Sequence, residues 1–363
     1  MATTTTIGLD LAKNVFQVHG VDASGKTTIR RQLKRREVLA FFEKLQPRCL
    51  VGMEACGSSH DWARRIEALG HTVHQLPAED VKAYRRHNKT DAADAEAICE
   101  AVTRPRLKVV PTKTVEQQML SVPHTVRDHL ITVRTATRNM IRSLLSEFGV
   151  IAATGDKGLE TLLAIVTDAA RTEIPAPLRP PLMAAAAVLA ETEASLDRID
   201  AQIAAHAKTD ERVRRLKSIP GVGPLIASAF VAAVTAPQIF PSGRAFAASL
   251  GVTPKMTGTG GEVTYGPVSK RGNVYLRRLL YLASAARLAA AQKRPATADP
   301  KLTALLARMP FRKAALALAN KTARIIWVLL TRGGTFIDKH LPAAHAQRAS
   351  GSAMTQYAGS VEI

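Results

Sequence analysis

The order of strand-like and helix-like segments in the first 110 residues constrains this chain more than any other feature. Apolar and β-branched runs predict strands at residues 5–10, 14–22, 27–33, 49–54 and 71–77, and helical spacing appears at residues 35–45, at 58–70 and from residue 91. Three strands joined by short turns, then alternating helices and strands, are typical of a ribonuclease-H-like α/β domain. In that architecture the first and fourth strands lie side by side.

Four carboxylates stand at strategic points of this pattern. Asp10 ends the first predicted strand and Glu54 ends the fourth, so we expect them to be adjacent in space. Asp91 and Asp94 open the predicted helix and are three residues apart, so they share one face of it. Carboxylate oxygens suit Mg²⁺, and two such ions can clamp the attacking and leaving oxygens of a phosphoryl transfer. The alternative is structural, with Asp91 as a helix N-cap and Asp94 as a first-turn acid.

Composition indicates the partner of such a site. The 363 residues carry a formal charge of +20, while 46% are hydrophobic, so the basicity belongs to a folded protein. A surplus of Lys and Arg favours a polyanion such as nucleic acid, although a solvated basic surface or an anionic membrane would also fit. No stretch is predicted to span a membrane or to be a signal peptide. Cys49, Cys56 and Cys99 lack zinc-type spacing, which favours reduced thiols in a cytoplasmic protein.

The chain is predicted to have four parts: residues 1–111 as the α/β domain, 112–210 as a helical middle, 211–340 as a mostly helical carboxy-terminal domain, and 341–363 as a disordered tail. Heptad-like apolar spacing at residues 183–208 predicts a coiled coil, within the chain or between protomers. A plain amphipathic helix in a bundle is an equal alternative.

Two motifs of the carboxy-terminal region suggest contact with phosphate. SIPGVGPLIA, at residues 218–227, is similar to a helix-hairpin-helix element, in which Gly221 and Gly223 would let the backbone approach a phosphate. The alternative is a tight turn without a ligand. Four cations follow with no acid between them: Lys270, Arg271, Arg277 and Arg278. They are expected to contact phosphate, or else to form a solvated helix face.

A glycine-rich segment lies between these two motifs. It offers hydroxyl groups at Thr257, Thr259, Tyr265 and Ser269, and Gly260 and Gly261 directly follow Thr259. Local chemistry favours a β-hairpin turn here. An exposed hydroxyl beside arginines could also attack phosphorus if a base or a metal ion activated it.

Taken together, the motifs resemble those of the DEDD-type insertion-sequence transposases related to the Piv and MooV DNA invertases, described as bridge-RNA-guided recombinases. GLDLAK, GMEACG and NKTDAADAEAI resemble the three acidic motifs of a RuvC-like domain, and SIPGVGP, FAASLGVTP and VSKRGNVYLRRLL resemble the hallmarks of the carboxy-terminal transposase domain. The resemblance covers nearly the whole chain. It implies a DNA recombinase whose Mg²⁺ site is Asp10, Glu54, Asp91 and Asp94.

The resemblance also implies partners and a second catalytic group. A structured noncoding guide RNA would select donor and target DNA, a coiled coil would join protomers into a homodimer or homotetramer, and a serine followed by glycine would attack DNA. In this chain the position five residues after Pro254 is Thr259. Either Thr259 replaces the serine, or Ser269 substitutes for it, or the covalent step is impaired. We favour Thr259.

Two rival functions remain open on sequence alone. A RuvC-like junction resolvase would use metal-activated water and leave no covalent adduct. A non-enzymatic nucleic-acid-binding scaffold would bind DNA equally well with or without Mg²⁺ and cut nothing.

Overall fold

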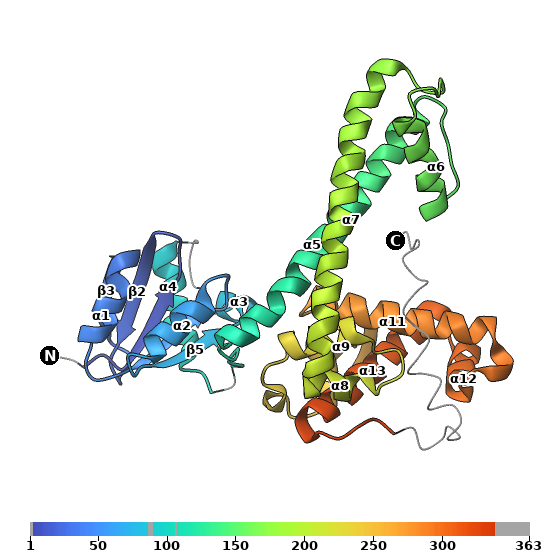
Figure 1. Cartoon of the computed structure of the whole chain (residues 1–363). Helices are drawn as coiled ribbons and strands as arrows, with labels where there is room; N and C mark the ends of the chain where they lie inside the picture. The colour runs from blue at the N-terminus through green and yellow to red at the C-terminus, as the bar shows by residue number, and fades with distance from the viewer. Residues whose placement is uncertain (1–2, 86–89, 106, 338–363) are drawn as a thin grey trace. The chain divides into compact units, whose positions relative to one another are not determined.

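The computed structural model describes residues 3–85, 90–105 and 107–337, and the chain divides into two compact units, Met1–Gln118 and Met119–Ile363 (Figure 1). The second unit therefore contains most of the predicted helical middle together with the carboxy-terminal region. The tail predicted at residues 341–363 lies outside the described residues.

The first unit is built on one five-stranded sheet with the strand order β3-β2-β1-β4-β5. Its elements are β1 (Thr6–Asp10), β2 (Val15–Val21), β3 (Thr27–Lys34), α1 (Val38–Lys44), β4 (Leu50–Glu54), α2 (Ser59–Glu67), β5 (Thr72–Leu76), α3 (Ala78–Lys82) and α4 (Asp91–Val102). β1 pairs antiparallel with β2 and parallel with β4, so the predicted neighbourhood of the first and fourth strands is confirmed. The short helix α3 was not predicted.

The sheet is covered on both faces, which explains why its central strands are apolar along their whole length. Ile7 and Leu9 of β1 are fully buried, as are Val51 and Met53 of β4. On the face covered by α1 and α2, the ring of Trp62 meets that of Phe16 edge to face with centroids 4.9 Å apart. α4 packs against β1, β2 and β4.

The second unit is helical apart from one β-hairpin. Its elements are α5 (Val115–Ser146, which begins in the first unit), α6 (Asp156–Thr167), α7 (Arg179–Thr209), α8 (Glu211–Lys217), α9 (Pro224–Ala233), α10 (Gly243–Ser249), β6 (Pro254–Thr259), β7 (Glu262–Val268), α11 (Val274–Lys293), α12 (Pro300–Arg308) and α13 (Phe311–Arg332). Pro123 lies inside α5 without ending it. The middle of the chain is thus helical, as predicted, except for the segments between α5 and α6 and between α6 and α7.

The heptad-like residues of α7 face other helices of the same chain. Leu182 and Leu189 share a buried cluster with Ile141 and Leu145 of α5, and α6 closes the far end of this pair (Figure 1). Further along α7, Ala207 joins the core formed by α8, α9, α11 and α13. Of the alternatives left open by the sequence, packing within the chain therefore accounts for this face of α7.

α13 is the one helix, in the part of the chain that the structure describes, that is long and apolar enough to cross a membrane by length and composition. Sequence analysis did not single it out. Its apolar residues, among them Ala319, Ala323 and Ile326, are buried against α8, α10 and α11. Packing in the core of the second unit is therefore sufficient to explain its composition.

A buried polar network joins α5, α7, α9 and α11. The Nε2 of His124 lies 3.0 Å from the hydroxyl oxygen of Ser228, and its Nδ1 lies 3.3 Å from that of Tyr275. Beside them, Arg127 donates two hydrogen bonds to Asp200, of 2.5 and 3.1 Å. His124 is only 5% exposed, and burial together with the neighbouring Arg127 lowers its pKa from the ordinary 6.5 to about 4.

This pKa predicts a pH-dependent stability of the second unit. Between pH 6.5 and about 4 the unfolded chain binds a proton at this histidine that the folded chain excludes, so the free energy of unfolding should fall as the pH falls. The free energy of unfolding should fall by up to about 1.4 kcal/mol per pH unit, and its total loss should be on the order of 3 kcal/mol. The pH dependence fades above pH 6.5 and is nearly gone about one pH unit higher.

Urea unfolding followed by the fluorescence of Trp327, in a Trp62→Phe background, measures this effect in the second unit alone. His19 and His60 also have lowered pKa values, but they lie in the first unit. The His124→Gln variant keeps polar contacts without the titration, so its stability should change less over the same pH range. Equal losses in both proteins would show that other groups cause the dependence.

Candidate functional site

Asp10 and Glu54 end two neighbouring parallel strands. The register pairs Gly8 with Gly52 and Leu9 with Met53, so the next positions in register are Asp10 and Glu54. Both carboxylates are half-buried, whereas the residues directly before them are fully buried. The sheet thus brings together two acids that are more than forty positions apart in sequence.

Two glycines place α4 directly against these strands. A Cβ atom on Gly8 would lie 2.5 Å from the backbone nitrogen of Cys99, and one on Gly52 would lie 2.7 Å from the Cβ of Val102. Neither approach is possible for a residue with a side chain. The Sγ of Cys99 lies near the carbonyl of Thr6, while Ala95 lies at Gly8, so α4 runs antiparallel to β1. Its first turn therefore points toward the strand end that carries Asp10.

That first turn carries the predicted acidic pair. The N-cap is Thr90, whose hydroxyl oxygen accepts a hydrogen bond from the backbone N–H of Ala93, so the alternative of Asp91 as the N-cap is wrong. Asp91 is exposed, whereas Asp94 is 8% exposed. The Oδ1 of Asp94 lies 2.5 Å from the Nε of Arg85, and the two side chains form an ion pair.

The four carboxylates are not gathered into one ligand set in this structure. Within residues 3–85, 90–105 and 107–337, no three His, Cys, Asp or Glu side chains lie close enough together to hold one metal ion. The donor chemistry nevertheless fits Mg²⁺. The carboxylates of Asp10 and Glu54 are half-buried at the ends of adjacent strands, and the buried carboxylate of Asp94 is already paired with a cation. Sequence reasoning missed Arg85 as that partner.

In the carboxy-terminal region, α8 and α9 are joined by the tight turn that SIPGVGP predicted. Gly221 has φ +83°, and a Cβ there would collide with the side chain of Arg287. A glycine is therefore required at position 221, both by the turn and by the close approach of Arg287. A Cβ at Gly223 would meet nothing, and this residue is the N-cap of α9. Gly221 is exposed and Gly223 is half-buried, so the space beside Gly223 is open although the residue itself is the less exposed of the two.

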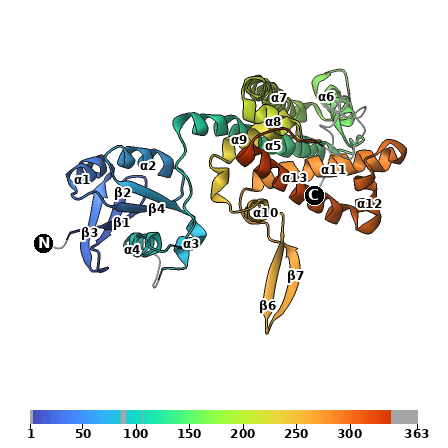
Figure 2. The same ribbon diagram turned by 90° about the horizontal axis from the view of Figure 1, so that it is seen from below.

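Thr259 is the last residue of β6 and pairs with Glu262 of β7. Gly260 and Gly261 form the turn between them, with φ of 60° and 88°, as expected for a two-residue hairpin loop. The hairpin projects from the helices of the second unit (Figure 2), and every residue of it from Pro254 to Pro267 is exposed. The β-hairpin predicted from local chemistry is confirmed, and it places the Thr259 hydroxyl beside its tip.

Ser269, the alternative hydroxyl, lies at the base of the same hairpin. Its backbone N–H donates to the carbonyl of Thr253 at 2.9 Å. Its Oγ is buried and has no hydrogen-bond partner among the described residues. The two candidate nucleophiles therefore differ sharply in their access to a substrate.

The four predicted phosphate-binding cations fall into two pairs. Lys270 and Arg271 are exposed on the loop after the hairpin. Arg277 instead donates to the carbonyls of Leu250 and Arg271, at 3.2 and 2.6 Å, and so braces that loop. The prediction that both helix arginines point outward is therefore not met.

Arg278 forms an ion pair with Asp128 of α5 and stacks on the ring of Tyr275, with its guanidinium carbon 5.6 Å from the ring centroid. It remains partly exposed, because its side chain keeps 40% of its accessible surface. Sequence reasoning missed the ion pair because Asp128 is 150 positions away.

Comparison with known proteins finds matches to transposases, in agreement with the sequence motifs. Residues 213–299 match a family model described as "Transposase IS116/IS110/IS902 family", and residues 7–150 match a model described as "Transposase" for the DEDD group of IS110 elements. A protein of Pseudomonas aeruginosa named "Probable family 20 transposase" is 46% identical over 90% of this chain and 96% of its own length.

Two further relatives are named as transposases of insertion sequences. The transposase for IS1328 of Yersinia enterocolitica is 34% identical over 93% of this chain and 99% of its own length. The transposase for IS1111A of Coxiella burnetii is 35% identical over 91% and 90%, respectively.

Proposed function

The chain belongs to the IS116/IS110/IS902 family of transposases, enzymes that cut and rejoin DNA, and we propose that it does so with a carboxylate-bound Mg²⁺ site and a hydroxyl nucleophile. The observation that carries this proposal is the placement of Asp10 and Glu54 at adjacent strand ends, with the first turn of α4 directed toward them.

Asp10, Glu54, Asp91 and Asp94 would hold the metal. When bound, Mg²⁺ supplies positive charge that stabilises the oxygens on the attacked phosphorus. Arg85 also supplies a positive charge to Asp94, because an unpaired carboxylate at 8% exposure would be costly.

Thr259 would be the nucleophile. Its Oγ1 would lose its proton and attack the scissile phosphorus, the bond from phosphorus to the leaving strand oxygen would break, and that oxygen would take up a proton. The resulting phosphothreonine diester keeps the energy of the broken bond, so a second strand hydroxyl can reverse the step and join a new end. The exposed tip position supports Thr259 over Ser269, whose Oγ is buried.

DNA, and a structured guide RNA, would bind through phosphate contacts, in keeping with the charge of +20. Lys270 and Arg271 are exposed cations beside the hairpin, and Gly223 offers the open backbone at the start of α9. We place the protein in the cytoplasm, where Cys49 and Cys99, both buried, would stay reduced.

Removal of both loop charges tests the phosphate contacts. The double variant Lys270→Gln, Arg271→Gln should bind duplex DNA more weakly whatever its sequence, and the slope of log affinity against log salt should flatten by about 1.8 for two lost contacts. Lys157→Gln with Lys208→Gln removes two exposed charges elsewhere in the second unit and serves as the control. Arg277 is unsuitable because its loss would also release the loop. A change at one base position alone would instead identify base readers.

Association of two copies would use α5. An outward stripe of this helix has apolar residues at intervals of seven: Met119, Val126, Val133 and Met140. These correspond to the a positions of a coiled coil, and Val122, three residues after Met119, corresponds to a d position. Ile141 and Leu145, on another side of the same helix, are buried within the chain. We therefore propose a homodimer, or a homotetramer built from it.

Charge on this stripe should separate the copies. Val126, which is 42% exposed, can be replaced without opening a core, so Val126→Glu should shift the sedimentation coefficient from dimer to monomer at micromolar protein. Thr135→Glu puts the same charge at an exposed position off the stripe and should leave the dimer intact. A dimer that survives Val126→Glu would place the interface elsewhere.

The proposed function is tested by incubating the chain with element-end DNA and its flanking RNA, with and without Mg²⁺. A recombinase should give rejoined strands and a protein–DNA adduct that resists denaturation, only with Mg²⁺. Metal-dependent cleavage without an adduct would indicate the resolvase, and metal-independent binding without cleavage would indicate the scaffold.

A further inference from the structure

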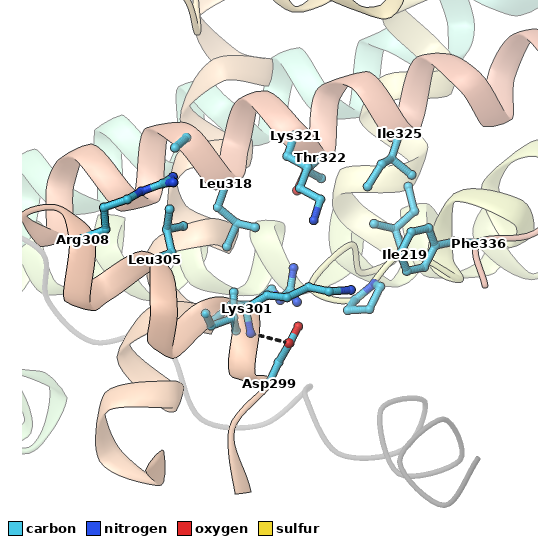
Figure 3. A pocket seen from close by; sticks show the side chains of 14 residues that line it. Ile219, Asp299, Lys301, Leu305, Arg308, Leu318, Lys321, Thr322, Ile325 and Phe336 are labelled. Atoms are coloured by element: carbon cyan, nitrogen blue, oxygen red, sulfur yellow. Dashed lines mark hydrogen bonds between the residues drawn. The ribbon is translucent and has the colours of Figure 1, made fainter. Parts of the chain in front are cut away.

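A second feature of the carboxy-terminal unit lies apart from the hairpin and its basic loop. A cavity of about 290 Å³ is enclosed by the turn before α9, by α12 and by α13 (Figure 3). Leu305 and Leu318 lie together in its middle, and Ile219 and Phe336 lie together at one end. Its interior is thus lined by apolar side chains.

Cations surround this apolar interior. Arg287, Lys301, Arg308 and Lys321 all line the cavity, against one carboxylate, Asp299. That carboxylate is engaged as the cap of α12, where it accepts a hydrogen bond of 2.9 Å from the backbone N–H of Lys301. Arg308 and Lys321 are exposed. The mouth of the cavity is therefore strongly positive.

This combination limits the ligand. A simple inorganic anion would leave the apolar lining unused, and a neutral apolar molecule would leave the cations unused. An unpaired nucleotide has both a flat, largely apolar base and a phosphate on each side of it. The volume, at the small end for ligand pockets, suits one base and excludes a base pair.

A groove next to the cavity on α13 continues the positive surface. It is lined by Arg244, Arg324 and Trp327, and it shares Ala317, Lys321 and Ile325 with the cavity. A strand that inserted one base could thus lay its next phosphates along these arginines. Cations that follow a backbone beside aromatic rings are typical of single-strand binding.

We infer that this cavity receives an unstacked base of a single nucleic-acid strand, with the flanking phosphates on Arg308 and Lys321. The inference rests on the proposed function, since it names a further contact of the same DNA or RNA. It adds a site that holds a strand after its duplex has opened. This site is separate from the carboxylates and from Thr259.

The test uses the full chain and fluorescence anisotropy with a labelled strand of about 12 nucleotides, as DNA, as RNA, and as an abasic DNA strand. Ala317 is an exposed residue of the cavity wall, so Ala317→Trp should fill the cavity without disturbing the core. The wild type should prefer the DNA strand over the abasic one by about tenfold. In Ala317→Trp this preference should fall toward one. Ala290→Trp, at an exposed position of α11 outside the cavity, should retain it.

The cations are tested separately. Arg308→Gln with Lys321→Gln should weaken binding to normal and abasic strands alike and flatten the salt slope by about 1.4, the value for two phosphates of a single strand. Lys313→Gln removes an exposed charge of α13 outside the cavity and should have less effect.

The outcomes separate this inference from the proposed function. Suppose that the wild type binds strands, and that Ala317→Trp keeps both the full preference for normal over abasic DNA and the full affinity for RNA. The cavity then takes no base, and the recombinase proposal stands. If the wild type binds neither DNA nor RNA, the recombinase proposal itself fails. A loss confined to DNA or to RNA supports the inference and identifies which strand enters.

Discussion

The Asp10→Asn variant is expected to lose strand cleavage by a factor on the order of 10³ or more while it stays folded. Asp10 is half-buried at the end of β1, so its carboxylate can be replaced by an isosteric amide without creating a cavity. The change removes one of two adjacent negative charges that would hold Mg²⁺. Metal titration by calorimetry should show weaker Mg²⁺ binding, which gives a readout independent of activity.

The matched change at Asp94 has a second consequence. Because Asp94 is paired with Arg85 at 2.5 Å, Asp94→Ala would leave a mostly buried guanidinium unpaired, at a cost of about 3 kcal/mol. Asp94→Asn should therefore be compared with Asp94→Ala by thermal unfolding before activity is interpreted.

Glu100→Gln, on the same helix, removes a carboxylate that forms an ion pair with Arg104 and should leave cleavage unchanged. Full cleavage by Asp10→Asn would remove the metal site from the mechanism.

The first unit could be predicted closely because its signals are local. Most of the strands are short apolar or β-branched runs bounded by turn residues, and the chain order of three strands before the first helix admits few arrangements. The pairing of β1 with β4, and with it the adjacency of Asp10 and Glu54, follows from that order. Gly8 and Gly52, which set the distance to α4, carry no signal of their own in a single sequence.

Long-range polar contacts could not be predicted in the same way. Arg277 and Arg278 were expected to face solvent because their neighbours in sequence are cations and leucines. Two of their partners, the carbonyl of Leu250 and the carboxylate of Asp128, lie far away in sequence, and the third, the carbonyl of Arg271, is reached only because the loop folds back. The ion pair between Arg85 and Asp94 and the cavity beside α13 likewise depend on tertiary packing, for which periodicity gives no information.

In the hairpin, the turn could be predicted from the sequence, whereas the contact of its hydroxyl group with a substrate could not. Gly260 and Gly261 between β-like runs predict a two-residue turn, and the turn is present. Whether the hydroxyl before that turn reaches a phosphate depends on DNA, and no local pattern decides it. A chemical test of Thr259 is therefore needed.

Thr259→Ala is expected to eliminate the covalent protein–DNA product, whereas Thr259→Ser should retain or raise it. Loss of the hydroxyl removes the attacking oxygen altogether. Serine keeps the oxygen and lacks the β-methyl group that crowds attack and restricts the rotamers of threonine. Thr259 is exposed on the hairpin and makes no core contact, so neither change should alter stability by more than about 0.5 kcal/mol.

Adducts trapped by denaturation, digested with trypsin and sequenced by mass spectrometry, measure the attachment site directly. Thr257→Ala removes a neighbouring hydroxyl on the same exposed strand and is the matched control, which should keep full activity. Because the Oγ of Ser269 is buried, an attack from that residue would require the base of the hairpin to open. DNA found on Ser269 or Tyr265, together with an active Thr259→Ala protein, would refute the assignment of Thr259 and would leave the carboxylates as the catalytic groups of this proposal.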